Sequence, residues 1–179
     1  FVCFRTEFIK KMLNIDRLNP LSIATEIKGY DYNGVKKYRS CSSEDKSALE
    51  YNTILFPINI DGNHWALAVI VTKEMKIIYY DSNGCVGHVY LNHLLQWIVD
   101  ESLEKYNIQI DKSMWTFEHA ACPQQQNGSD CGVFVCLYAH YLLHSMEMTF
   151  TQQHITDSNI RTTIAVALLQ HSVAHVSAI

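Results

Sequence analysis

This sequence contains little proline and glycine and has no excess of positive charge. With 3 prolines and 7 glycines in 179 residues, no flexible or low-complexity linker divides the chain. The net charge of -4 argues against a nucleic-acid-binding surface, which favours basic residues. Apolar residues form no uninterrupted run long enough to span a membrane. The remaining composition is that of a globular protein, and we expect one domain, 1–179, with a buried core.

The sequence also lacks a secretion signal and a disulfide framework. Charged residues between Arg5 and Lys11 interrupt the apolar residues at the start of the chain, so no signal peptide is indicated there. The 6 cysteines follow no framework spacing, and a chain with 48% apolar residues does not need disulfides to fold. We therefore expect an intracellular reducing compartment, the cytoplasm or the nucleus. Because the chain does not begin with Met, we expect a fragment of a longer protein.

No metal and no cofactor are expected. Four residues have the types of zinc ligands: His119, Cys122, Cys131 and Cys136. Their spacing, however, fits no common zinc pattern.

Segments typical of strands lie in the middle of the chain. Three of them are rich in β-branched and aromatic residues: Thr53–Phe56, Trp65–Val71 and Lys76–Tyr80. The second is nearly all apolar, which is typical of a central strand covered on both faces. Residues 111–118 are expected to form another short strand.

Helices are expected on both sides of these strands. Apolar residues recur at helical spacing over 1–12 and over 91–103. Residues 131–144 are apolar enough for a buried helix, and 159–173 are expected to form a C-terminal helix. The pattern predicts an α+β fold with a central sheet flanked by helices.

The short connection between the second and third strands predicts an antiparallel hairpin. A two-residue or four-residue loop within 72–75 puts His64 diagonal to Asp81 on one face, whereas a three-residue loop would put them on opposite faces. Diagonal neighbours lie roughly 7–8 Å apart at the backbone, within reach of an imidazole and a carboxylate. Such a carboxylate fixes the tautomer of a histidine and leaves its other nitrogen free as a base. A cross-strand pair that only caps the sheet edge is the alternative, and the hairpin alone does not decide.

Cys131 stands between a turn and an apolar segment, in the sequence P-Q-Q-Q-N-G-S-D-C-G-V at 123–133. At a helix N-terminus, free backbone N–H groups stabilise a thiolate and can also bind an oxyanion. Gln125 is a candidate for a second, neutral donor. A lone cysteine in such a place is more often a buried apolar residue. A cysteine, a histidine and a carboxylate together instead indicate a nucleophile with its base.

On these residues the sequence resembles the SUMO-specific (sentrin-specific, Ulp-type) cysteine proteases of the adenoviral-proteinase-like clan, which has deubiquitinating and deneddylating members. The matching motifs are G-N-H-W at 62–65, Y-Y-D-S at 79–82, P-Q-Q-Q-N-G-S-D-C-G at 123–132 and F-T-Q-Q-H-I at 150–155. The order His, Asp, Cys is also the family's order. The resemblance implies a papain-like thiol protease fold with a central mixed sheet between helices.

The resemblance also implies a role for each site residue. Cys131 would be the nucleophile, His64 the general base and then the acid, and Asp81 the residue that orients His64. Gln125 matches the family's oxyanion-hole glutamine. Trp65 matches the tryptophan that covers a narrow tunnel for a Gly-Gly tail, in which any side chain would clash.

The function implied is that of a thiol isopeptidase and endopeptidase. It would cleave after the C-terminal Gly-Gly of a ubiquitin-family modifier and free that modifier from substrate lysines. The family usually carries an N-terminal W-L-x-D stretch that forms the second wall of the tunnel, but no tryptophan precedes Trp65 here. The modifier therefore stays open among SUMO, ubiquitin and the neddylation modifier. Bacterial effectors of this fold act on ubiquitin, and for such a protein the expected compartment is the host cytosol.

Two other functions are alternatives. A same-fold acetyltransferase would need a basic patch for the phosphates of coenzyme A, and the 14 Lys and Arg residues form no cluster near the motifs. A non-catalytic module that binds the modifier would not need every catalytic residue type.

Overall fold

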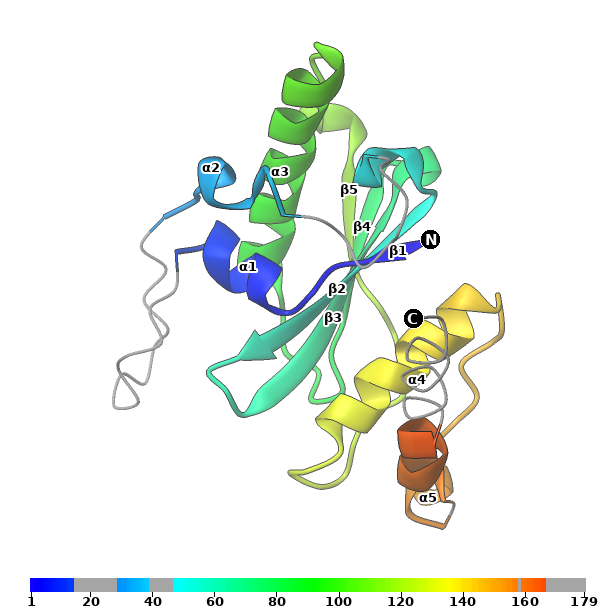
Figure 1. Ribbon diagram of the computed structural model, residues 1–179. Coiled ribbons are helices and arrows are strands. Elements are labelled where there is room, and N and C mark those ends of the chain that lie inside the picture. Colours follow the sequence, from blue (N-terminus) through cyan, green and yellow to red (C-terminus); the bar gives the residue numbers. More distant parts are fainter. Residues whose placement is uncertain (15–28, 39–46, 158, 167–179) are drawn as a thin grey trace, which may run out of the picture.

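The computed structural model describes residues 1–14, 29–38, 47–157 and 159–166, and its centre is a five-stranded sheet (Figure 1). The strands lie in chain order: β1 (Val2–Cys3), β2 (Thr53–Ile60), β3 (His64–Val71), β4 (Lys76–Tyr80) and β5 (Thr116–His119). The two outer pairs are parallel, whereas both pairs that include β3 are antiparallel. The sheet is therefore mixed, as the resemblance implied.

Helices are interspersed with the strands along the chain, and the first element is the strand β1. The α-helices are α1 (Glu7–Met12), α2 (Tyr32–Val35), α3 (His88–Tyr106), α4 (Cys131–Leu143) and α5 (Gln152–Asp157). Short 3₁₀-helices are η1 (Ala48–Glu50), η2 (Thr72–Glu74) and η3 (Lys112–Met114). In the part of the chain that the structure describes, no helix is both long and apolar enough to cross a bilayer.

Two of the predicted helices, over 91–103 and 131–144, are confirmed by α3 and α4. The predicted C-terminal helix is present over 160–166, and the rest of its predicted range lies outside the described residues.

β3 is the central strand, and its side chains alternate between two cores. Ala66, Ala68 and Ile70 belong to one core, whereas Leu67 and Val69 belong to the other. All of them are buried. The prediction of a central strand covered on both faces is confirmed, because alternate residues of one apolar run face opposite sides of a sheet.

Each face of the sheet has its own helical cover. On one face α1 and α3 enclose an aromatic group in which Phe4, Phe8, Phe56 and Trp97 have ring centroids 4.5–5.6 Å apart. Trp97 is buried and is the core tryptophan of α3. On the other face α4 packs its buried Phe134 against the sheet, and α5 lies beyond α4 (Figure 1).

The predicted helix over 1–12 is wrong for its first residues. The segment before α1 is a strand, β1, which pairs in parallel with the start of β2. The Phe4 N–H then donates to the Leu55 oxygen at 2.9 Å. Phe4 directly follows β1 and Phe8 lies on α1, but both side chains belong to the same core. Their spacing along the chain therefore resembles that of a helix. The pairing partner is distant in sequence, so local periodicity does not contain it.

The predicted strand over 111–118 is wrong in its first half. The Asp111 carboxylate accepts the Ser113 N–H at 2.9 Å and so caps η3, and the strand β5 begins only at Thr116. Trp115, which falls within that predicted range, lies between these two elements and is half-buried against the core on the α3 side.

Candidate active site

β3 and β4 form the predicted antiparallel hairpin. Val71 lies opposite Lys76, so the loop consists of residues 72–75. This is the four-residue loop, one of the two lengths that keep both residues of interest on one face. The register places His64, at the start of β3, beside Asp81, which directly follows β4.

His64 and Asp81 are in direct contact. His64 Nε2 lies 3.0 Å from each carboxylate oxygen of Asp81. Since an ionised carboxylate only accepts hydrogen bonds, Nε2 carries the ring proton and Nδ1 carries the lone pair. The predicted contact is therefore confirmed, and its geometry leaves a base on the ring.

The Asp81 carboxylate is 4% exposed and has further donors. The Asn83 N–H donates to it at 2.7 Å and the Tyr79 hydroxyl at 3.3 Å. Burial, followed by the charge of Asp81, raises the pKa of Tyr79, so the phenol remains a donor. These hydrogen bonds compensate the buried charge and fix the orientation of the carboxylate, which a residue that orients a histidine requires.

Cys131 is the first residue of α4, as predicted, and is 6% exposed. The first backbone N–H groups of a helix have no intrahelical partner, and the side chain of Asp130 does not cap them. The thiol thus lies at the positive end of a helix of 13 residues, where a thiolate is stabilised.

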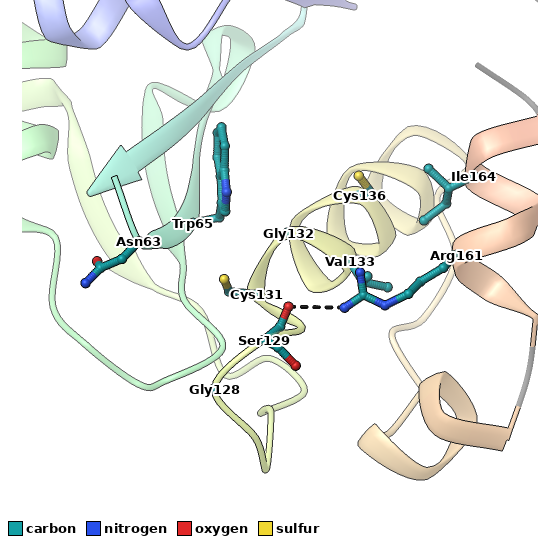
Figure 2. A pocket seen from close by; sticks show the side chains of 10 residues that line it. All are labelled: Asn63, Trp65, Gly128, Ser129, Cys131, Gly132, Val133, Cys136, Arg161 and Ile164. Atoms are coloured by element: carbon teal, nitrogen blue, oxygen red, sulfur yellow. Dashed lines mark hydrogen bonds between the residues drawn. The ribbon is translucent and has the colours of Figure 1, made fainter. Parts of the chain in front are cut away.

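The sulfur of Cys131 opens onto a pocket of about 450 Å³ (Figure 2). The pocket lies between the start of β3, the start of α4 and the helical segment 160–166. Its lining residues are Asn63, Trp65, Gly128, Ser129, Cys131, Gly132, Val133, Cys136, Arg161 and Ile164. A substrate that enters this pocket therefore meets the thiol.

Trp65 and Gly132 connect the strand of His64 to the helix of Cys131. The indole Cδ1 lies 3.6 Å from the position that a Cβ would take at Gly132. Each of these two residues is the chain neighbour of a predicted catalytic residue. The packing of α4 on β3 therefore brings together the segments that carry the base and the thiol.

Gln125 is fixed next to the end of β4. Its backbone N–H donates to the backbone carbonyl oxygen of Ser82 at 2.9 Å, and its side-chain oxygen accepts from the Ser82 hydroxyl at 2.6 Å. Its side-chain nitrogen donates to the backbone carbonyl oxygen of Asn127. The side-chain amide thus uses its oxygen for Ser82 and one N–H for Asn127, and the second N–H of its NH₂ remains for a further hydrogen bond. An N–H donor of this kind is what an oxyanion needs.

Asp130, directly before Cys131, is a residue of the site that was not predicted. Its buried carboxylate accepts from Asn127 Nδ2 at 2.6 Å and from Gln152 Nε2 at 2.8 Å, and it forms an ion pair with Arg161. The hydrogen bond from Asn127 is foremost among the contacts that hold the pKa of Asp130 below its usual range. The N-x-x-D spacing of Asn127 and Asp130 could have indicated their hydrogen bond from the sequence. No local pattern indicates the contacts of Asp130 with α5 and with segment 160–166.

Cys136 and His119 are two further residues with zinc-ligand types. Cys136 also lines the pocket, but desolvation of its thiol raises its pKa and keeps it protonated. His119, one of the four residues with zinc-ligand types, accepts the Gly87 N–H at 3.0 Å through Nε2. Within the described residues, no three His, Cys, Asp or Glu side chains gather into a metal-binding group.

A mixed sheet between helical layers, with a His–Asp pair at the strand ends and a cysteine at a helix N-terminus, defines a papain-like thiol protease fold. The model of the Ulp1 protease family, C-terminal catalytic domain, matches residues 2–176. The chain belongs to this family.

Known relatives agree with this assignment. The chain is similar to ubiquitin-like-specific protease ESD4 of Arabidopsis thaliana, with 31% identity over 160 residues, 89% of this chain and 30% of that protein. It is also similar to sentrin-specific protease 2 of Homo sapiens, with 36% identity over 133 residues, 73% of this chain and 22% of that protein. The chain thus spans less than a third of the length of either relative.

A solved structure of the C-terminal Ulp1 protease domain, in complex with SMT3, the yeast ortholog of SUMO, has a similar fold. The TM-score is 0.65 at 26% identity, over 84% of this chain and 60% of that chain.

Proposed function

We propose that this protein is a thiol isopeptidase and endopeptidase that cleaves after the C-terminal Gly-Gly of a ubiquitin-family modifier. The observation that carries the proposal is the contact of His64 Nε2 with both oxygens of Asp81, on the strand that packs against the helix of Cys131. That contact supplies an oriented base at the end of the sheet against which the helix of the thiol packs.

The reaction begins when the Cys131 sulfur attacks the carbonyl carbon of the terminal glycine while its proton passes to His64 Nδ1. The tetrahedral oxyanion then collapses, and His64 returns the proton to the departing lysine amine. The modifier is now a thioester on Cys131. A water molecule, deprotonated by His64, hydrolyses it and restores the thiol. These steps need no metal and no cofactor.

Asp81 and Gln125 support these steps. The Asp81 carboxylate holds the ring proton on Nε2 and stabilises the imidazolium that forms. The Gln125 NH₂ and the free N–H groups at the start of α4 are the donors for the oxyanion.

Trp65 is the residue of the pocket that recognises the tail of the modifier. Its indole Cδ1 lies 3.6 Å from the position of a Cβ at Gly132, and Trp65 and Cys131 line the same pocket. A narrow approach admits Gly-Gly and rejects larger residues.

A SUMO-type modifier is the first candidate substrate. Relatives of this chain carry the name sentrin-specific protease, and one similar domain is known in complex with the yeast ortholog of SUMO. Ubiquitin and the neddylation modifier remain in the panel to be tested. The thiol chemistry requires a reducing compartment, so the cytoplasm or the nucleus, or a host cytosol, is part of the proposal.

The test is the substitution Cys131→Ala. Cleavage of fluorogenic SUMO, ubiquitin and neddylation-modifier conjugates is compared between the chain and the variant, together with binding of the same modifiers. The proposal expects cleavage of at least one conjugate, its complete loss in Cys131→Ala, and retained binding. Retained turnover in the variant would refute it. Acetyl transfer from labelled coenzyme A is measured in parallel, and transfer without cleavage would support the acetyltransferase alternative.

A further inference from the structure

Asn83 contacts both members of the His64–Asp81 pair. It lies in the turn that leaves β4, and its backbone N–H donates to Asp81 Oδ1 at 2.7 Å. Its side-chain Nδ2 lies 3.3 Å from His64 Nδ1. The next residue, Gly84, donates its backbone N–H to the backbone carbonyl oxygen of Asp81 at 3.2 Å. This bond fixes the turn on the other side of Asn83.

The partners of the two ring nitrogens, a carboxylate and an amide NH₂, fix the direction of both hydrogen bonds on the ring. His64 Nε2 faces a carboxylate and therefore carries the proton. An amide NH₂ only donates, so Nδ1 accepts from Asn83 through its lone pair. An imidazolium ring has a proton on both nitrogens and cannot accept this bond. The contact from Asn83 therefore exists only with the neutral ring.

We infer that Asn83 is a positioning residue that holds His64 neutral, with the proton on Nε2 and the lone pair of Nδ1 ready to accept. The meaning of this role in catalysis rests on the proposed function, in which Nδ1 takes the proton of Cys131. Asn83 then competes with the thiol for one lone pair and has to release it at each turnover. In the resting protein, it favours the uncharged thiol and imidazole over the thiolate and imidazolium.

The groups around the ring act in opposite directions. Asp81, from the end of β4, favours the charged ring through its negative charge, and Tyr79 reaches the ring only through that carboxylate. Cys131 lies at the start of α4, and in the proposed reaction its thiolate form would also favour the charged ring. Asn83 opposes them, because its NH₂ stabilises only the neutral form. The balance keeps His64 available as a base.

The test measures the His64 ring directly, without a substrate. The full chain with Cys131→Ala and ¹⁵N-labelled histidine is the parent, because it removes the coupled thiol. Further variants add Asn83→Leu, Asn83→Asp or the control Asn92→Leu. Asn92 is an exposed residue of α3 whose amide donates to the His88 oxygen at 2.8 Å, so the control also loses a surface amide bond. The ring ¹⁵N shifts report the tautomer and the ratio of charged to neutral ring near pH 6.5.

In the parent we expect a neutral tautomer with the proton on Nε2. Asn83→Leu should raise the charged-to-neutral ratio by about threefold to tenfold, the effect of one hydrogen bond. Asn83→Asp should raise it further, because a carboxylate accepts from the Nδ1–H of the charged ring. This variant keeps the size and polarity of the side chain, so it provides the test if the leucine variant does not fold. Asn92→Leu should leave the ratio unchanged.

A proton on Nδ1 in the parent, or an unchanged ratio in the folded Asn83 variants, would overturn the inference. These results are distinct from a failure of the proposed function. If the chain cleaves no modifier while the ring responds as expected, the role of Asn83 in setting the tautomer stands and the enzymatic proposal falls.

Discussion

Asp81 and Asp130 are both buried carboxylates, and each has several hydrogen-bond donors. Asp81 is 4% exposed and faces His64, and Asp130 is 7% exposed and precedes Cys131 in the chain. Burial of a charge is unfavourable unless it is hydrogen-bonded. In the proposed mechanism Asp81 orients the base, whereas Asp130 accepts hydrogen bonds that fix the loop before Cys131.

Asp81→Asn should reduce kcat strongly without unfolding the protein. The amide has nearly the same shape, but its NH₂ would meet the ring proton on His64 Nε2, so the imidazole loses both its tautomer and its compensating charge. We expect kcat on a modifier conjugate to fall roughly 10²–10⁴-fold. The melting temperature is the control for folding, and a rate within about threefold of the unsubstituted chain would contradict the assigned role.

Asp130→Asn should destabilise the protein near neutral pH and much less in acid. Hydrogen bonds, first the one from Asn127, lower the pKa of Asp130 in the folded state. A lowered folded pKa means that the ionised carboxylate contributes stability above the unfolded pKa of about 3.9, and that this contribution is lost as the pH falls through the folded pKa. We expect a cost of roughly 1–3 kcal/mol in the free energy of unfolding at pH 7.

Urea unfolding at pH 7 and near pH 3 measures this difference between Asp130→Asn and the unsubstituted chain. The two proteins should converge in acid. An equal cost at both pH values would show that the charge of Asp130 does not matter.

The secondary-structure elements set the positions of these residues through two close contacts. The hairpin of β3 and β4 places His64 against Asp81, and the start of α3 packs onto Tyr79 of β4. A Cβ at Gly87 would lie 2.5 Å from ring carbons of Tyr79, which is itself 2% exposed and cannot move aside.

Gly87→Ala should therefore destabilise the protein by roughly 1–3 kcal/mol, the usual cost of overpacking. Gly128→Ala is the matched control, because a Cβ there meets nothing within 4 Å. Chemical denaturation of both variants is the measurement. Equal stability of the two would contradict the close packing of α3 on β4.

The register of the hairpin could be predicted from the sequence, but the first strand could not. The short connection predicted the hairpin, and two of the three loop lengths left open would place His64 diagonal to Asp81; the structure has one of these two, the four-residue loop. β1 depends on pairing with β2 across a long stretch of chain, and the helical spacing of Phe4 and Phe8 conceals it. Asp130 was missed for a similar reason, since its donors Gln152 and Arg161 come from later helical segments.

At the scale of the whole molecule, the site lies where the sheet meets one of its two helical layers. The core around Trp97 supports one face of β3, and the core around Phe134 holds α4 on the other face (Figure 1). Across that second interface, Trp65 lies 3.6 Å from the position that a Cβ would take at Gly132. The residue types of the site could be read from the sequence, but the contact of α4 with β3 is tertiary, and only the resemblance to known proteases implied it.

The most direct measurement of the central claim is covalent labelling of the chain with modifiers that carry an electrophile at the C-terminal Gly-Gly. Mass spectrometry of the adduct identifies the cysteine. We predict a single adduct on Cys131 with at least one modifier, its loss in Cys131→Ala and a much slower reaction in His64→Ala. An adduct on Cys85 or Cys136 instead, or labelling that persists in Cys131→Ala, would contradict the account.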